Sequence, residues 1–271
     1  MTMSLRALLF DVDGTLADTE EVHRRAFNAA FAQLGFDWQW DVPLYRDLLS
    51  VAGGKERLLH YWERLQPQIL RDRDGAELAS AVHAVKTEHY ARLVATGSAP
   101  LRPGVARLLH QAHARGFQLG IVTTTSADNV TALLQANLGR QGLAWFSAIG
   151  AGDAVARKKP APDIYYLVMG KIGVHSDECL AFEDSNNGLR AAQAAGVATV
   201  VTPTGYSAGE DFSGALIVLP HLGEPHNSLP QLEAINPGHG WVDVEQLVEW
   251  HTDARERSQA LRPIPTVLTA N

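Results

Sequence analysis

Short apolar runs and longer helical patterns alternate along most of the chain. Each run is almost continuously apolar, which is typical of strands that are buried on both faces of a parallel sheet. Six such runs predict strands at 5–10, 119–123, 146–149, 180–183, 198–201 and 216–219. Because strands that alternate with helices favour βαβ units, the sequence predicts an α/β fold built on a doubly wound parallel sheet.

A long block with helical patterning and no strand signal separates the first two predicted strands. Apolar residues recur there at helical spacing, for example at Val22, Ala26, Ala30 and Leu34. This block predicts a helical cap domain at 18–97, inserted into an α/β core made of 1–17 and 98–252. Residues 253–271 mix charges with prolines, so we expect a mobile C-terminal tail.

Two acidic residues follow the first predicted strand directly, in the sequence Asp11-Val-Asp13-Gly14-Thr15. Side chains alternate along a strand, so Asp11 and Asp13 leave it on the same side. Gly14 lets the chain turn sharply behind them, at the edge of the sheet where α/β proteins bind ligands. Taken alone, the motif also fits an ordinary turn. A calcium loop fits less well, because its glycine would be the sixth loop residue and a helix would precede it.

A second acidic pair, Glu183 and Asp184, ends the predicted strand 180–183, and a helix capped by Ser185 or Asn186 is predicted to follow. Four carboxylates at neighbouring strand ends would repel one another unless a cation lay among them. The set offers oxygen ligands without His or Cys, which favours Mg²⁺ over Zn²⁺. The pattern predicts a magnesium site whose residues are Asp11, Asp13, Glu183 and Asp184.

Two further loops carry groups that suit a phosphate. Hydroxyl residues follow the strand 119–123. We assign the phosphate-binding hydroxyl to Thr123 and a backbone contact to Thr124, while a shift of two residues would choose Thr125. Lys159 lies just before a helix that a proline is predicted to begin. It is the expected partner of the nucleophile and the phosphate, although threonines are also common in strands and loop lysines are usually solvated.

Composition restricts the partners of this chain. The formal net charge of −7 and the pI near 5.9 argue against a nucleic-acid partner, so an anionic substrate must be attracted by local positive charge. The single cysteine, Cys179, excludes an internal disulfide and fits a reducing cytoplasm. It lies on a predicted buried strand, which favours a core role over a nucleophilic one. No apolar run has membrane length, and the expected form is a cytoplasmic monomer.

Four of these motifs together resemble those of the haloacid dehalogenase superfamily. They are Asp-x-Asp-Gly-Thr, the hydroxyl after a strand, Lys-Pro-x-Pro-Asp and Glu-Asp-Ser-x-x-Gly. Asp18-Thr19-Glu20 and His23 resemble the branch that holds β-phosphoglucomutase and phosphoglycolate phosphatase. The stretches from Gly53 to Arg57 and from Tyr206 to Ala215 resemble the CbbY proteins of carbon-fixing organisms. The resemblance covers residues 5–250 and implies a Rossmann-like core with an inserted cap.

The resemblance implies an aspartyl-phosphate mechanism. Asp11 would attack phosphorus, and Asp13 would protonate the leaving oxygen and later activate water. Mg²⁺ would be held by Asp11, Asp184 and the main-chain carbonyl of Asp13, with Glu183 bound directly or through water. Thr123 and Lys159 would hold the phosphoryl oxygens. Closure of the cap would exclude bulk water.

Substrate selection is expected to belong to the cap. Lys55 and Arg57 begin a predicted helix and could bind a second, non-reacting phosphate, although both could be solvated charges. Asp18 and His23 flank the hinge and could contact sugar hydroxyls, although His23 could equally be structural. The CbbY resemblance implies that xylulose 1,5-bisphosphate is cleaved to xylulose 5-phosphate, which would clear an inhibitor of Rubisco.

Three functions therefore stay open at this point. The first is a phosphatase of a small phosphosugar, of the sugar-bisphosphate or phosphoglycolate type. The second is a phosphomutase of the β-phosphoglucomutase type, which shares the core residues and returns the phosphoryl group to a sugar. The third is a non-catalytic module that binds sugar phosphates, against which the presence of both Asp11 and Asp13 argues.

Overall fold

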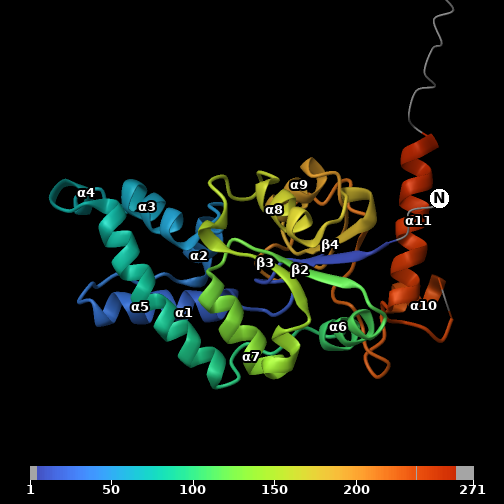
Figure 1. Ribbon diagram of the computed structural model, residues 1–271. Helices are drawn as coiled ribbons and strands as arrows, with labels where there is room; N and C mark the ends of the chain where they lie inside the picture. The colour runs from blue at the N-terminus through green and yellow to red at the C-terminus, as the bar shows by residue number, and fades with distance from the viewer. Residues whose placement is uncertain (1–4, 236, 261–271) are drawn as a thin grey trace, which may run out of the picture.

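The computed structural model describes residues 5–235 and 237–260 of the chain and shows a six-stranded parallel sheet with helices on both faces (Figure 1). The strands follow the order β3-β2-β1-β4-β5-β6. Their bounds are Ala7–Phe10 (β1), Gln118–Val122 (β2), Phe146–Gly150 (β3), Cys179–Glu183 (β4), Ala198–Val201 (β5) and Ile217–Val218 (β6). The predicted doubly wound α/β fold is confirmed.

The register of the central strands brings the two acidic pairs together. β1 lies between β2 and β4, and Phe10 is paired with Ile121 on one side and with Phe182 on the other. The amide of Asp11 continues this ladder and donates to the carbonyl of Phe182 at 3.0 Å. The residues that follow β1 and β4 therefore emerge side by side where the strand order reverses, which is where open α/β sheets bind ligands.

Side-chain alternation along β1 explains why the sheet is covered on both faces. Leu8 and Phe10 belong to one buried apolar cluster, whereas Ala7 and Leu9 belong to a second. The helices outside the cap are α6 (Val105–Ala114), α7 (Ala127–Leu143), α8 (Asp163–Ile172), α9 (Asn186–Ala194), α10 (Pro230–Ile235) and α11 (Val244–Ala260), with short 3₁₀ turns η1 (Gly152–Ala154) and η2 (Ser176–Glu178). None of the helices in the described part of the chain is long and apolar enough to span a membrane.

Five helices between β1 and α6 form a separate body beside the sheet (Figure 1). They are α1 (Glu20–Gln33), α2 (Val42–Leu48), α3 (Gly54–Leu65), α4 (Ile69–Asp72) and α5 (Gly75–Ala95). Their own apolar cluster is rich in aromatic rings, including Phe31, Trp40 and Trp62. The chain leaves the core and returns to it at one place, where Ala17 and Leu101 form an antiparallel bridge. This arrangement supports the proposed cap at 18–97.

The C-terminal prediction needs correction. Residues 253–260 continue helix α11, whose earlier residues Leu247 and His251 are buried, and are not a tail. Within this segment Arg255 forms an ion pair of 3.6 Å with Asp177 of the core. The rest of the predicted tail, 261–271, lies outside the described residues. The last predicted strand, 216–219, is shortened to two residues.

Candidate active site

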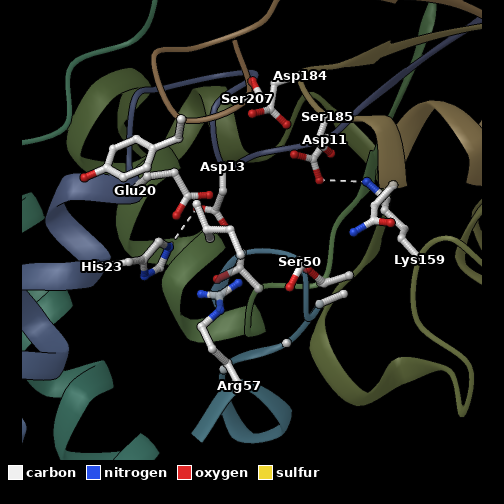
Figure 2. Close-up of a pocket in the computed structure, with 18 of the residues that line it drawn as sticks. Asp11, Asp13, Glu20, His23, Ser50, Arg57, Lys159, Asp184, Ser185 and Ser207 are labelled. Carbon is white, nitrogen blue, oxygen red and sulfur yellow. Dashed lines mark hydrogen bonds and ion pairs between the residues drawn. The ribbon is translucent and has the colours of Figure 1, made fainter. Parts of the chain in front are cut away.

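A cavity lies between the carboxyl ends of the strands and the cap helices (Figure 2). The core lines it with residues that include Asp11, Asp13, Thr124, Thr125, Lys159, Asp184 and Tyr206. The cap lines it with residues that include Glu20, His23, Ser50, Gly53, Gly54, Arg57, His83 and Lys86. Polar groups from both bodies thus face a single space, as in a site that the cap closes over its substrate.

Lys159 connects the two acidic pairs. Its Nζ atom donates to Asp11 Oδ1 at 2.8 Å (Figure 2) and to Glu183 Oε1 at 2.6 Å, and all three residues are buried. Burial by itself would lower the pKa of Lys159, but Asp11 and Glu183 outweigh it and raise that pKa, so the ammonium stays charged. Burial raises the pKa of Asp11, and it raises that of Glu183 to about 7. One lysine therefore does not neutralise this group of acids.

The acidic cluster fits a hard divalent cation. Oxygen atoms of Asp11, Glu183 and Asp184 all lie within 4.8 Å of one another. Glu183 Oε2 is buried without a hydrogen-bond partner, and burial next to Asp11 raises the pKa of Asp184 well above its usual range. Gly14, with a φ of 77°, allows this packing, since a Cβ there would lie 2.1 Å from Asp184 Oδ2. Excess negative charge on oxygen ligands is what Mg²⁺ binding would offset.

The carboxylate of Asp13 has different surroundings from this cluster. Thr19 donates to its Oδ1 at 2.5 Å, and His23 Nε2 lies 2.8 Å from the same atom. His23 Nδ1 in turn lies 2.5 Å from the Nζ atom of Lys86. The sequence predicts that Asp13 contacts the metal through its main-chain carbonyl, and that contact stays a prediction.

The pKa values of this chain of residues favour a donor role for His23. Burial, together with Lys86, lowers the pKa of His23 to about 4, so the ring is neutral near pH 7. Lys86 then donates to Nδ1, and Nε2–H donates to Asp13. Burial opposes ionisation of Asp13, but His23 and Thr19 outweigh it and lower the pKa of Asp13. Burial lowers the pKa of Lys86 itself to about 7.

The threonine assignment shifts by one residue. Thr123 is buried, and its hydroxyl accepts from the amide of Thr125 at 3.2 Å within the same loop. Thr124 and Thr125 line the cavity, whereas Thr123 does not. The Thr125 hydroxyl accepts from Asn129 at 3.1 Å. The geometry therefore favours Thr124 as the hydroxyl residue that faces a phosphate, in place of the predicted Thr123.

The predicted substrate residues of the cap divide into two groups. His23 and Arg57 line the cavity, whereas Lys55 and Asp18 do not. Lys55 instead donates to Asp153 of the core at 2.5 Å. The largely exposed Asp18 forms an ion pair of 3.2 Å with Arg102. The structure therefore does not place Lys55 and Asp18 as substrate contacts, contrary to the prediction.

Arg57 is held in place by the cap. Its guanidinium donates to Tyr45 Oη at 3.0 Å and to the carbonyls of Leu48 and Val51, both at 3.2 Å. Tyr45 donates onward to Glu20 Oε2 at 3.1 Å. These hydrogen bonds hold the positive charge of Arg57 in a fixed position on the cap side of the cavity, opposite Asp11 and Lys159 (Figure 2).

Glu20 and Lys86 face the cavity and were not predicted. Burial and the charge of Asp13 raise the pKa of Glu20 to about 7. Near neutral pH its carboxyl group is therefore present in both the protonated and the ionised form. Glu20 is three residues before His23 in α1, which places both on one helix face. Lys86 occupies an apolar stripe of α5 with Val82, Tyr90 and Val94, at spacings of four. A lysine within such a stripe is a sequence signal that could have indicated a buried functional amine.

Comparison with known proteins agrees with this geometry. A haloacid dehalogenase-like hydrolase model matches residues 5–196. The chain belongs to the haloacid dehalogenase-like hydrolase family. Within this family, it is 54% identical over 247 residues to the plasmid protein CbbY of Cupriavidus necator, covering 91% of this chain and 97% of that protein. It is 33% identical to a phosphoglycolate phosphatase of Yersinia pseudotuberculosis over 85% of this chain and 96% of that one.

Solved structures of this hydrolase family show the same architecture. CbbY of Rhodobacter sphaeroides in complex with phosphate has a TM-score of 0.75 and 46% identity, covering 80% of this chain and 94% of that one. A variant of that protein in complex with xylulose 1,5-bisphosphate has a TM-score of 0.73 and 44% identity over the same shares of the two chains. The chain is a phosphatase of the CbbY type.

Proposed function

We propose that the enzyme removes the 1-phosphate of xylulose 1,5-bisphosphate to give xylulose 5-phosphate, and so clears an inhibitor of Rubisco. The observation that carries this proposal is the placement of two cationic groups in one cavity. Lys159 lies beside Asp11 at the core, and Arg57 lies on the cap side. A bisphosphate can occupy both ends, with one phosphate at the nucleophile and the other at Arg57. The bisphosphate complex of a CbbY relative supports the same substrate class.

Asp11 is the proposed nucleophile. Its carboxylate forms a bond to phosphorus as the bond to the sugar oxygen breaks, which gives an aspartyl-phosphate. Lys159 holds Asp11 in place through the 2.8 Å contact and would bind a phosphoryl oxygen, together with Thr124. Mg²⁺ held by Asp11, Glu183 and Asp184 would offset negative charge on the transferring group.

Asp13 is the proposed acid and base. For the first step Asp13 must carry a proton in the substrate complex, and the negative charge of a phosphate beside it favours the protonated form against the effect of His23 and Thr19. Asp13 then protonates the leaving sugar oxygen and later removes a proton from the water that hydrolyses the aspartyl-phosphate. Thr19 and His23 hold the Asp13 carboxylate at 2.5 and 2.8 Å. Lys86 fixes the ring of His23, so that the hydrogen bond to Asp13 comes from a neutral imidazole. His23 is thus proposed to orient Asp13, and Glu20 to accept hydrogen bonds from sugar hydroxyls.

Two related activities share the same core residues. Phosphoglycolate phosphatases are 33% identical to this chain. A phosphomutase would return the phosphoryl group to a sugar, and the β-phosphoglucomutase-like structure from Thermotoga maritima has 25% identity and a TM-score of 0.57. Because the chain is an enzyme of a hydrolase family, the non-catalytic binding module is dropped.

A substrate panel separates these activities. Purified enzyme with Mg²⁺ is given xylulose 1,5-bisphosphate, phosphoglycolate or β-glucose 1-phosphate, and both free phosphate and sugar products are measured. The proposal predicts phosphate release with the highest kcat/KM for the bisphosphate, and loss of activity in EDTA that added Mg²⁺ restores. A higher kcat/KM for phosphoglycolate, or a sugar isomer formed without phosphate release, would favour the corresponding alternative.

The proposed setting is the cytoplasm. Cys179 is a buried free thiol, and burial raises its pKa to about 12, so it is an unreactive core residue suited to a reducing compartment. We propose a monomer that acts on a small molecule and has no nucleic-acid or membrane partner, as the acidic charge of the chain favours.

A further inference from the structure

Four charged residues meet where the cap approaches the core beside the cavity. Lys55 and Glu56 come from the first turn of α3 in the cap. Asp153 comes from η1, and Lys158 comes from the loop before α8, both in the core. Three ion pairs join the two bodies: Lys55–Asp153 at 2.5 Å, Lys158–Glu56 at 2.5 Å and Lys158–Asp153 at 3.0 Å. We refer to these four residues as the ionic cluster.

The ionic cluster is packed closely and is not a set of free surface charges. The Lys158 side chain is only 12% exposed, whereas that of Asp153 is 60% exposed. A Cβ on Gly53 would lie 2.1 Å from Glu56 Oε2 and 2.8 Å from Lys158 Nζ, so the main chain at Gly53 runs directly against the cluster. Hydrogen bonds from Lys55 and Lys158 lower the pKa of Asp153 to about 2. The charges of the two lysines and the two acidic residues therefore neutralise one another between the cap and the core.

The ionic cluster is continuous with the catalytic residues. Lys158 directly precedes Lys159, whose amine contacts Asp11. On the cap side, Gly53 and Gly54 line the cavity, and Arg57 follows Glu56 directly. Closure of the cap therefore brings Glu56 to Lys158 at the same time as it brings Arg57 over the cavity. The cluster connects the position of the cap to the loop that carries the catalytic lysine.

Cap–core contacts elsewhere at the cavity are mostly of another chemical kind. Arg46 donates to the main-chain carbonyl of Gly205 at 3.1 Å, and Tyr206 donates to Glu21 at 2.9 Å. Neither of these contacts pairs a cation of one body with an anion of the other, whereas Asp18 and Arg102 form such a pair at the hinge. Salt screens charges that are exposed to solvent, with a Debye length of about 10 Å at 0.1 M. In the ionic cluster the side chains of Glu56 and Asp153 are 42% and 60% exposed, so salt can weaken their ion pairs. The ionic cluster joins three such pairs at one place, and it is therefore the part of this boundary away from the hinge that responds most to ionic strength.

We propose that Lys55, Glu56, Asp153 and Lys158 form an ionic latch that holds the cap closed and positions the Lys159 loop for catalysis. The latch makes closure depend on ionic strength. Lys158 and Glu56 are positioning residues, since they act through Lys159 and the cap and do not touch the reacting atoms. Only the kinetic test of the latch rests on the proposed function, because the structural test needs no substrate.

A distance measurement tests closure without any substrate. Cysteines that replace the exposed Glu63 of α3 and Lys171 of α8 carry a fluorescent donor and acceptor, while the buried Cys179 stays unlabelled. Energy transfer is measured in the full chain with Glu56→Gln, with Lys158→Gln and with both substitutions. The exposed pair Glu88 and Arg92, which lies within α5 and does not cross to the core, gives the matched control variants Glu88→Gln and Arg92→Gln.

The latch predicts that each single substitution lowers energy transfer at low salt and that the double substitution adds little to the larger single effect. Added salt lowers energy transfer in the wild type towards the level of the variants, and the control variants leave it unchanged. The kinetic counterpart is a roughly two- to fivefold fall in kcat/KM for each single variant, the scale of a partly exposed ion pair. This fall should come mainly from a higher KM, with kcat little changed.

Unchanged energy transfer in both single variants at low salt would overturn the latch, as would strictly additive effects in the double variant. These readouts are independent of the substrate. If the wild type fails to hydrolyse the bisphosphate while the energy-transfer cycle behaves as stated, the substrate proposal fails and the latch stands. If the wild type hydrolyses the bisphosphate but energy transfer does not respond to the substitutions, the latch fails and the substrate proposal stands.

Discussion

The amine of Lys159 lies 2.8 Å from Oδ1 of Asp11, and both residues are buried. The two side chains come from segments that are 148 positions apart in the sequence. Parallel pairing of β1 with β2 and of β2 with β3, together with the packing of α8 against β2 and β3, brings them together. The contact orients the nucleophile and supplies a fixed positive charge where the phosphate must bind, which is the arrangement expected for electrostatic stabilisation of phosphoryl transfer.

Lys159→Met should reduce kcat by about 10²-fold or more, because a pre-oriented charge beside the reacting group is lost. The substitution keeps much of the side-chain volume and leaves Asp11 and Glu183 without their shared donor. Steady-state phosphate release measures the effect, with Lys171→Met on the exposed face of α8 as the control. Wild-type kcat in Lys159→Met would contradict the proposed role.

Asp13→Asn should lower turnover of a sugar phosphate by roughly 10²–10⁴-fold, since the amide cannot exchange the proton. The loss should be smaller with p-nitrophenyl phosphate, whose leaving group needs little protonation. Comparing kcat/KM on the two substrates separates the acid role from damage to the fold. A small and equal loss of kcat/KM on both substrates would show that Asp13 does not take part in the proton transfers.

Lys86→Met should raise the melting temperature at about pH 7 while it lowers activity. Burial lowers the pKa of Lys86 from 10.5 to about 7 in the folded state, so between these values the unfolded chain binds more protons and wild-type stability rises with pH. The cost of charging the buried amine is fully present below about pH 7 and fades towards pH 10.5.

Thermal unfolding of wild type and Lys86→Met across this range checks the prediction. The stability advantage of the variant should be a few kcal/mol near neutral pH and should shrink as the pH rises. A constant difference at every pH would mean that packing, and not charge burial, determines the effect of the substitution.

Arg57→Ala should lower kcat/KM for a bisphosphate by about ten- to a hundredfold, because a charge-assisted hydrogen bond to the distal phosphate is worth about 1.5–3 kcal/mol. It should barely change turnover of p-nitrophenyl phosphate, which has no second phosphate. Arg71→Ala, at an exposed arginine of α4, is the matched control. Similar losses on both substrates would indicate that Arg57 serves the cap structure through Tyr45 and the carbonyls it contacts.

The fold could be predicted because continuous apolar runs identify buried parallel strands directly. The proximity of Asp11 to Glu183 and Asp184 could also be predicted, since parallel strands end at the same edge of a sheet. The direction of side chains beyond a strand end depends on the local turn, so Thr123 was preferred where the structure favours Thr124. The charges after Asp253 predict a tail, because the sequence alone does not show that Leu247 and His251 bury one side of α11 against the core.

Partners from distant segments explain the other differences. Lys55 and Asp18 have the chemistry of substrate contacts, but Asp153 and Arg102 pair with them, and no local pattern reveals those partners. Lys86 is different, because its place within an apolar helical stripe was visible in the sequence. Its contact with His23 depends on how α1 packs against α5.

The most direct test of the account is steady-state phosphate release from xylulose 1,5-bisphosphate by the wild type and by Asp11→Asn, both with Mg²⁺. We predict hydrolysis to xylulose 5-phosphate by the wild type and none above background by Asp11→Asn, because the neutral amide cannot attack phosphorus. Circular dichroism confirms that the variant is folded. Phosphate release at the wild-type rate by folded Asp11→Asn would contradict the covalent mechanism and the placement of the active site at Asp11.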